Sequence, residues 1–284
     1  MTSSPPVQPV ESESVEYVLG TDEAEAIRLG LQHRLWSASA FLLWERAGLR
    51  TGMRVLDVGC GPGHAALDMA DIVGPKGSVV GIDESAVFLT HLHQRSIARR
   101  LTNIERLLGD VQDVGSLGLP EGQFDFAYAR WVLCFVPDPD AVVAGVARLL
   151  KPGGRFVIQD YFNYESMTIA PRRASFTRLV QAIAAAWRAR GGDPDVVGRV
   201  PEMLAHHGVT MTHLAVNDRI ARPTDTMWAW PDTFWRTFVP RLEASGFLSA
   251  EDRAAFEADW DEASADASNF VHLPPVYDVI GVKS

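Results

Sequence analysis

The sequence predicts an α/β fold in which a mostly parallel sheet carries helices on both faces. Short apolar runs at 55–58, 79–82 and 124–129 have the continuous hydrophobic character of strands buried on both sides. Segments with helical periodicity separate these runs, as in consecutive βαβ units. Hydrophobic residues make up 47% of the 284-residue chain, so one large core with insertions is within reach of a single α/β unit.

The first 50 residues are expected to form a tail followed by a helical region. Residues 1–15 are rich in Ser, Pro, Val and Glu, and they have too little apolar content to pack, so we expect a mobile tail. Residues 16–50 contain a helical segment, with an apolar series from Ile27 to Trp36. We therefore expect a helix in front of the first strand.

A glycine-rich turn follows the first predicted strand. Residues 55–63 read VLDVGCGPG, and such glycines let a ligand approach the backbone and the N–H groups of the next helix. The dinucleotide fingerprint G-x-G-x-x-G needs a small third residue, where this chain has His64. Asp57 would repel a pyrophosphate and attract a cationic amine. The turn therefore predicts a ligand that carries an ammonium group.

Together with this turn, four later motifs resemble those of the class I S-adenosylmethionine-dependent methyltransferases. They follow in the family's order, within about residues 50–160, as VVGID at 79–83, LLGDV at 107–111, FDFAYAR at 124–130 and LKPGGRFVI at 150–158. The resemblance is to the small-molecule branch that includes the ubiquinone-biosynthesis methyltransferases. It implies a Rossmann-like, seven-stranded, mostly parallel sheet and S-adenosyl-L-methionine as the cofactor.

The same resemblance implies a cofactor site at the carboxyl ends of these strands. In the family, the acid that matches Asp83 binds both ribose hydroxyls, and the acid that matches Asp110 contacts the adenine amino group. Asp83 could instead be a helix N-cap. Tyr17 and Gln32 resemble lid residues over the methionine end, although both could be structural. The expected cofactor site comprises Tyr17, Gln32, Asp57, Gly59, Cys60, Gly61, Gly63, Asp83, Glu84, Asp110, Val111 and Arg130.

Two segments exceed what this fold requires. One follows the fifth strand, and the other follows the sixth strand, whose carboxyl end lies at the same cofactor edge if that strand runs parallel. The sixth strand is predicted at 209–220 and the last at 275–282. We expect an N-terminal helical lid at 16–50, a cofactor-binding core at 51–160, a helical insertion at 161–195, a core continuation at 196–223, an aromatic-rich helical insertion at 224–270 and the last core strand at 271–284.

The second insertion contains four of the eight tryptophans of the chain. Because binding pockets are mostly lined by apolar and aromatic side chains, this roof predicts a small, hydrophobic or aromatic methyl acceptor. Phe256 and Trp260, spaced i and i+4, are expected to form a satellite core instead. The expected acceptor contacts are Trp131, Tyr161, Phe162, Tyr164, Trp228 and Trp235.

The predicted reaction is an in-line displacement on a methyl group that is already electrophilic. Positioning can contribute about 7–11 kcal/mol, whereas a general base adds about 10² to 10⁴ in rate. Many relatives carry a histidine pair after the fourth strand, where this chain has Cys134 and Phe135. The remaining candidate bases are Asp160, Tyr161, Glu165 and His272. We favour O-methylation slightly over N- or C-methylation.

Composition argues against several other classes. The net charge of −10 and the scattered arginines are unsuited to nucleic-acid binding. No apolar run approaches the length of a membrane span, and the N-terminus lacks a signal-peptide pattern. Cys60 and Cys134 suggest neither a disulfide nor a metal site, so we expect a cytoplasmic protein. We expect it to be a monomer or a homodimer. Two alternatives stay open, namely an inactive S-adenosylmethionine-binding partner or regulatory module and, less favoured, an NAD(P)-dependent oxidoreductase.

Overall fold

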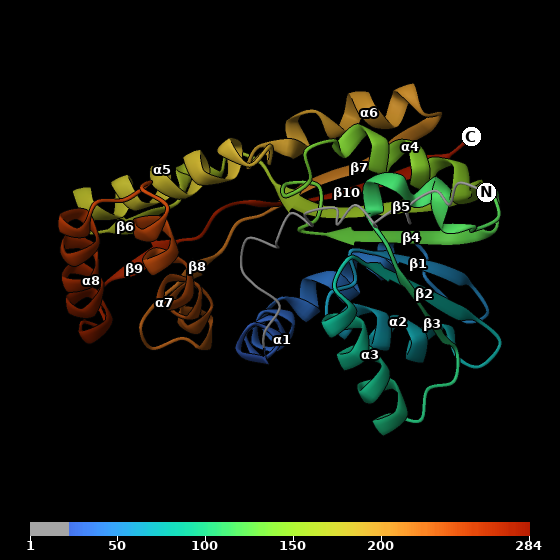
Figure 1. The fold of residues 1–284 in the computed structure, drawn as a ribbon, viewed down its shortest axis with the longest axis horizontal. Helices are drawn as coiled ribbons and strands as arrows, with labels where there is room; N and C mark the ends of the chain where they lie inside the picture. The colour runs from blue at the N-terminus through green and yellow to red at the C-terminus, as the bar shows by residue number, and fades with distance from the viewer. Residues whose placement is uncertain (1–22) are drawn as a thin grey trace, which may run out of the picture.

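A seven-stranded sheet forms the centre of the computed structural model, which describes residues 23–284 (Figure 1). The strand order is β3-β2-β1-β4-β5-β10-β7, and only β10 runs antiparallel to its neighbours. This arrangement confirms the predicted fold class. The strands are β1 (Arg54–Val58), β2 (Ser78–Asp83), β3 (Ile104–Leu108), β4 (Phe124–Arg130), β5 (Leu150–Tyr161), β7 (Val209–Asn217) and β10 (Val276–Lys283).

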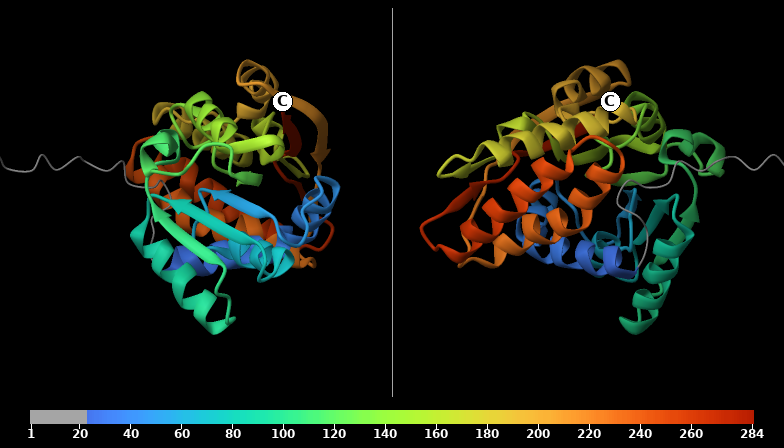
Figure 2. Two further views of the ribbon diagram at one scale, coloured as in Figure 1. Left: turned by 90° about the vertical axis from the view of Figure 1, so that its right-hand side faces the viewer. Right: turned by 60° about the vertical axis from the view of Figure 1, so that its left-hand side comes forward.

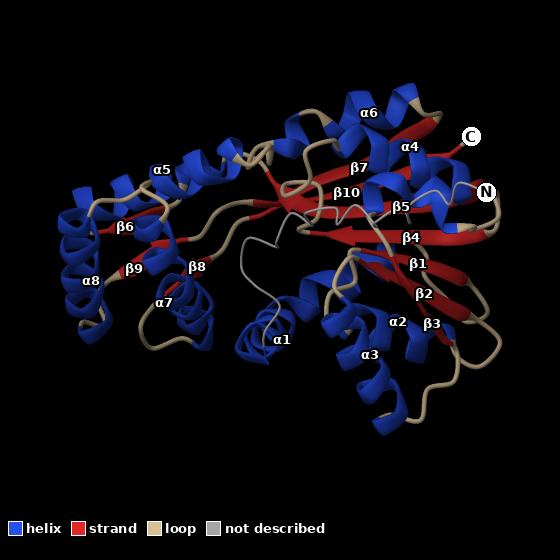
Figure 3. Ribbon diagram, viewed as in Figure 1, coloured by secondary structure: helices blue, strands red, loops and turns tan. Residues whose placement is uncertain are grey.

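Helices cover both faces of this sheet, as Figure 3 shows by colour. Because successive strand side chains point to opposite faces, Leu56 packs into one hydrophobic layer and Val55 into the other. One face carries α1 (Glu23–Arg46), α2 (His64–Val73) and α3 (Ala86–Ala98), and the other carries α4 (Pro139–Leu149) and α6 (Val200–His206). The sheet therefore lies between two hydrophobic cores.

The local signals that begin these elements have identifiable partners. The Asp138 side chain accepts a hydrogen bond from the Ala141 N–H at 3.0 Å, and Pro139 occupies the first turn of α4, as expected of an N-cap followed by proline. The tail at 1–15 and Tyr17 lie outside the described residues. Among residues 23–284, no helix is long and apolar enough to cross a membrane.

The two insertions differ from the expectation of purely helical segments. They hold α5 (Ala174–Ala189), α7 (Ala229–Ala244) and α8 (Ala250–Ala265), but the first insertion also holds β6 (Thr168–Ala170). This strand forms a second sheet with β9 (Phe270–His272) and β8 (Ile220–Ala221), which lie at the borders of the second insertion. The predicted sixth strand therefore ends at Asn217, and the chain then crosses to the small sheet. Strands of two or three residues are too short to carry an alternating pattern.

The insertion helices pack together beyond the carboxyl ends of the parallel strands (Figures 1 and 2). Phe256 and Trp260 are buried and lie against Phe176, with ring centroids 6.2 and 6.4 Å away. Trp228 stacks on Trp260 at 4.4 Å. Phe256 and Trp260 pack within the insertions as expected, and Trp228 joins them. These rings are continuous with one hydrophobic layer of the main sheet and do not form a separate satellite core.

Candidate active site

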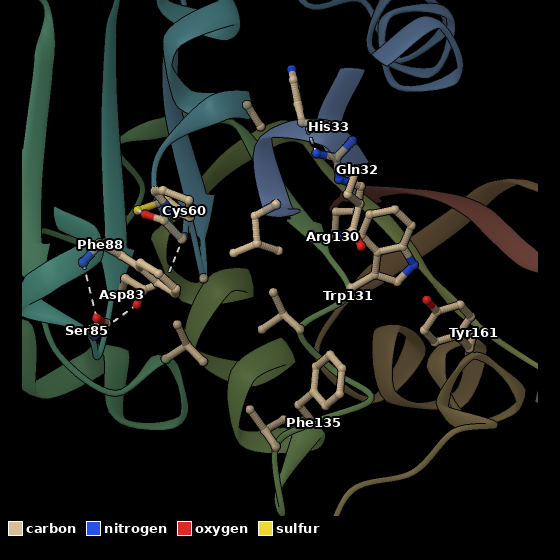
Figure 4. Close-up of a pocket in the computed structure, with 18 of the residues that line it drawn as sticks. Gln32, His33, Cys60, Asp83, Ser85, Phe88, Arg130, Trp131, Phe135 and Tyr161 are labelled. Carbon is tan, nitrogen blue, oxygen red and sulfur yellow. Dashed lines mark hydrogen bonds between the residues drawn. The ribbon is translucent and has the colours of Figure 1, made fainter. Parts of the chain in front are cut away.

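A cavity of about 610 Å³ lies between the carboxyl ends of the strands and the insertions. Its walls come from α1, from the glycine turn after β1, from the ends of β2, β4 and β5, and from α7 (Figure 4). This is the edge at which open α/β sheets bind their ligands. One half of the cavity is lined by charged and backbone groups, and the other half by aromatic rings.

The glycine turn adopts backbone conformations that other residues rarely reach. Gly59, Gly61 and Gly63 have φ angles of +63°, +53° and +84°, in the left-handed region that favours glycine. Gly59 and Gly61 line the cavity, together with Cys60. Gly63 does not, which corrects its expected role. A Cβ there would lie 2.3 Å from Leu92 Cδ1, so this glycine lets α2 start against α3.

Asp83 ends β2 and connects the second strand to the glycine turn. Its carboxylate accepts hydrogen bonds from the Gly61 N–H at 2.7 Å and from the Ser85 N–H at 2.9 Å. The N-cap of α3 is Ser85, whose hydroxyl accepts from the Phe88 N–H. Asp83 is therefore not the cap of that helix. It lines the cavity, and burial raises its pKa.

Asp57 and Arg130 place opposite charges at the ends of neighbouring strands. Asp57 is 3% exposed, and its Oδ2 is buried without a hydrogen-bond partner among residues 23–284. Burial raises the pKa of this carboxyl to about 7, against the opposing effect of Arg130. The Nη1 of Arg130 is likewise buried and unpaired within the described chain. The pair offers one acceptor and one donor to a zwitterionic group.

The far end of the same half is formed by residues that follow β2 and β3. Asp110 accepts a hydrogen bond from the Gln112 N–H at 2.8 Å and lines the cavity with Val111 and Glu84. Burial raises the pKa of the Glu84 carboxyl. These acids and the Asp83 carboxylate converge although β2 and β3 are separate in sequence, because parallel neighbours end at the same edge.

The helix α1 closes the cavity from the side. Gln32 lines it, and its Oε1 accepts hydrogen bonds from the Trp230 indole N–H at 2.8 Å and from Arg28 at 3.2 Å. Arg28 in turn pairs with Glu25 at 2.7 Å. The helix α1 is thus joined to α7 by a polar contact that the sequence does not suggest.

The other half of the cavity is an assembly of stacked rings. Trp131 lies at 26° to the ring of Tyr161 and at 26° to that of Trp230, with centroids 6.2 and 5.9 Å away. Tyr164 and Trp187 extend this wall, with centroids 4.8 Å apart. Trp131, Tyr161, Tyr164 and Trp235 line the cavity as expected, whereas Trp187 and Trp230 were missed.

Two of the expected acceptor contacts lie outside the cavity lining. Phe162 is 40% exposed and packs against Tyr277 on β10. Trp228 is turned into the satellite core, where its indole N–H donates to Ser264. Phe162 directly follows Tyr161, the last residue of β5, and neighbouring side chains along a strand point in opposite directions. Trp228 ends a short 3₁₀ helix (Thr226–Trp228) and stacks on Trp260.

Three candidate bases are also placed away from the cavity. Asp160 is fully buried and accepts hydrogen bonds from the N–H groups of Val132, Cys134 and Tyr161 at 3.2, 3.2 and 2.9 Å. It therefore holds the loop after β4. Glu165 pairs with Arg188. His272 lies in β9 with its Nε2 3.8 Å from an Asp218 oxygen. Neither of these two side chains lines the cavity.

Tyr161 is the one candidate base that lines the cavity. Burial raises the pKa of its hydroxyl well above the usual value, and burial does the same for Tyr164. Both phenols therefore stay protonated and act as hydrogen-bond donors rather than as bases. The aromatic half is therefore able to donate hydrogen bonds, and the Arg28 charge lies close enough to oppose the rise in the pKa of Tyr161.

Comparison with known proteins agrees with this geometry. A family model described as a methyltransferase domain matches residues 49–190, half of the chain. Demethylmenaquinone methyltransferase of Lactococcus lactis is 35% identical over 136 residues, 48% of this chain and 52% of that protein. The 2-phytyl-1,4-naphtoquinone methyltransferase of Synechococcus elongatus is 40% identical over 131 residues, 45% of this chain and 53% of that protein.

The chain thus spans about half the length of these curated relatives. Among solved structures, the YcgJ protein of Bacillus subtilis has a similar fold, with a TM-score of 0.61 at 17% identity. That similarity covers 87% of this chain and 98% of the other. It therefore extends over the sheet and most of the surrounding elements.

Proposed function

The chain belongs to the class I S-adenosylmethionine-dependent methyltransferases, and from this membership we propose that it methylates a small, flat, oxygen-bearing aromatic molecule. The family match covers the core that the alternative dinucleotide oxidoreductase would need for its own cofactor. That alternative is therefore set aside. The cofactor of the family, S-adenosylmethionine, supplies an electrophilic methyl group on a sulfonium centre.

The charged half of the cavity suits the two ends of this cofactor. Asp57 would hold the ammonium group and Arg130 the carboxylate, since each has a buried polar atom without a partner in the described chain. Asp83 would accept the ribose hydroxyls, and Asp110 would face the adenine. These residues bind and orient, which is the main requirement of an in-line displacement.

The observation that carries the acceptor class is the stack of Trp131, Tyr161 and Trp230. Nearly parallel ring faces favour a flat ring in offset or edge contact. The Tyr161 and Tyr164 hydroxyls, kept protonated by burial, would donate hydrogen bonds to a phenolate or carbonyl oxygen. An acidic phenol brings its own negative charge to such a site, so the transfer requires no protein base.

We favour the acceptor oxygen as the atom methylated, and the ring carbon beside it is the second choice. The oxygen and the neighbouring ring carbon of a phenolate share the same enolate-like electron density. The two curated relatives described above act on naphthoquinone-type compounds according to their names. The tyrosine donors would stabilise the charged oxygen in either case. Which atom reacts depends on how the ring is turned between the indoles.

The test is a transfer assay with methyl-labelled S-adenosylmethionine and a panel of acidic phenols, hydroxyquinones, quinols and amines. We expect label in an O-methyl product of an acidic phenol, identified by mass spectrometry and NMR. A C-methyl product would move the reacting atom to the ring. Tight binding of S-adenosylhomocysteine with no transfer to any acceptor would instead favour the inactive binding module.

A further inference from the structure

A continuous row of hydrogen bonds runs from the surface of the molecule to the charged half of the cavity. Arg99 Nη1 donates to Asp68 Oδ1 at 2.9 Å, and Asp68 Oδ2 lies 2.8 Å from His33 Nε2. The other ring nitrogen, His33 Nδ1, lies 2.9 Å from Arg130 Nη2. Arg99 directly follows α3, and the other three side chains come from α2, α1 and β4, so the row joins α1 to the sheet.

The chemistry of these partners assigns the protons of His33. Arg130 can only donate, so His33 Nδ1 must accept with its lone pair. The single ring proton then sits on Nε2, where it is donated to the Asp68 carboxylate. A second proton on Nδ1 would face a guanidinium N–H. Burial, together with the nearby Arg130 and Arg99 charges, lowers the pKa of His33, which agrees with the neutral form.

This arrangement fixes one side of the Arg130 guanidinium and leaves the other available. His33 holds Nη2, while Nη1 is buried without a partner in the described chain. The guanidinium also lies 5.1 Å from the centroid of the Trp131 ring. Figure 4 shows His33 and Gln32 beside Arg130 at this end of the cavity. A planar donor held in this way can meet a carboxylate without reorientation.

We propose that His33 is a positioning residue that holds Arg130 in place for the carboxylate of the cofactor's amino-acid end. The inference rests on the proposed function, because it assigns a ligand group to Arg130. It adds a role for the N-terminal helix, which thereby takes part in cofactor binding through Arg130. Asp68 and Arg99 orient the imidazole from the outside.

Two substitutions separate the two sides of the imidazole. His33→Asn keeps an acceptor near the Nδ1 position, and His33→Gln keeps a donor near the Nε2 position but withdraws the acceptor from Arg130. Calorimetry would measure binding of S-adenosylhomocysteine, which has the carboxylate, and of 5′-methylthioadenosine, which lacks the amino-acid end. We expect His33→Gln to weaken the first ligand about tenfold, as for one charge-assisted hydrogen bond, and the second less than twofold.

His33→Asn is expected to keep its affinity for S-adenosylhomocysteine within about threefold of the wild type, because it retains the Arg130 acceptor. A role in folding alone would weaken both ligands together and would not distinguish the two variants. Equal losses for both ligands, or equal losses in both variants, would overturn the inference. A wild-type chain that binds neither ligand would overturn the proposed function instead.

Asp68→Ala provides a second route should His33→Gln fail to fold, as judged by circular dichroism. The Asp68 side chain is 18% exposed and does not line the cavity, so its loss removes the outer partner of the imidazole and of Arg99 but no group of the cavity wall. We expect a smaller loss, about threefold, again confined to S-adenosylhomocysteine. No loss, or a loss shared by 5′-methylthioadenosine, would contradict the positioning role.

Discussion

The charged and aromatic halves of the cavity are built in different ways. The charged half takes its side chains mainly from residues 57–130, at the ends of neighbouring parallel strands. The aromatic half joins the loop after β4 to rings from both insertions. Strand register determines the first half, and the packing of insertions determines the second. The two halves meet at the hydrogen bond from the Trp230 indole N–H to Gln32.

The halves also differ in charge. Asp57, Asp83, Glu84 and Arg130 are titratable or charged groups within one half, and burial raises the pKa values of the three acids. The aromatic half presents tyrosines that stay neutral. Changes in pH should therefore alter cofactor binding. Substitutions that change the aromatic side chains or remove their hydroxyl groups should instead alter binding of the methyl acceptor.

The largest effect is expected from Gly63→Ala, which tests whether the charged half depends on backbone packing behind it. Left-handed strain costs about 1–2 kcal/mol and overpacking about 1–3 kcal/mol, and the new Cβ would meet Leu92. The free energy of unfolding should fall by about 2–5 kcal/mol in urea denaturation. Gly61→Ala has no neighbour within 4 Å and should lose only the strain. Equal losses would contradict this account.

Asp83→Ala should weaken S-adenosylhomocysteine binding by about 1.5–3 kcal/mol, the scale of hydrogen bonds to a charged group. Isothermal titration calorimetry would measure the change. Asp83→Asn retains one acceptor oxygen and should lose less. If affinity is unchanged while the fold is intact, Asp83 does not belong to the cofactor site.

The pH dependence of cofactor binding should follow Asp57, whose pKa is raised to about 7 by burial. Below pH 7 the neutral acid attracts an ammonium group poorly, so S-adenosylhomocysteine affinity should fall about tenfold per unit as the pH decreases. Above this value the affinity should level off. Calorimetry across pH 5.5–8.5, roughly centred on that value, would detect the change, and Asp57→Asn should flatten the profile. A profile unaltered by that substitution would rule out Asp57.

The smallest effect is expected from Tyr161→Phe, which removes one donor from the aromatic half. The kcat/KM for the acceptor should decrease about five- to tenfold, and S-adenosylhomocysteine affinity should stay constant. Tyr277→Phe is the matched control, since Tyr277 packs on Phe162 and does not line the cavity. A loss of cofactor affinity in Tyr161→Phe would show that the two halves are not separable.

Much of the charged half could be predicted because its residues lie next to strand patterns. Asp57, Asp83 and Asp110 each follow an apolar run, and parallel strands bring such positions to one edge. Gly63 was misplaced because a glycine needed for helix packing looks the same in sequence as one needed for a ligand. Asp160 was misplaced because a strand end can equally hold a loop in place.

The sequence by itself determined the order of the core strands and helices along the chain, the glycine turn and the acids at the ends of the strands, since these depend on local periodicity and on parallel register. Only the tertiary structure decided that Trp230 and Trp187 line the cavity, that Trp228 does not, and that His33 meets Arg130. His33 and Arg130 are 97 positions apart. Contacts of this kind arise from how whole helices pack, and no local pattern records which face of an aromatic or polar segment will be turned inward.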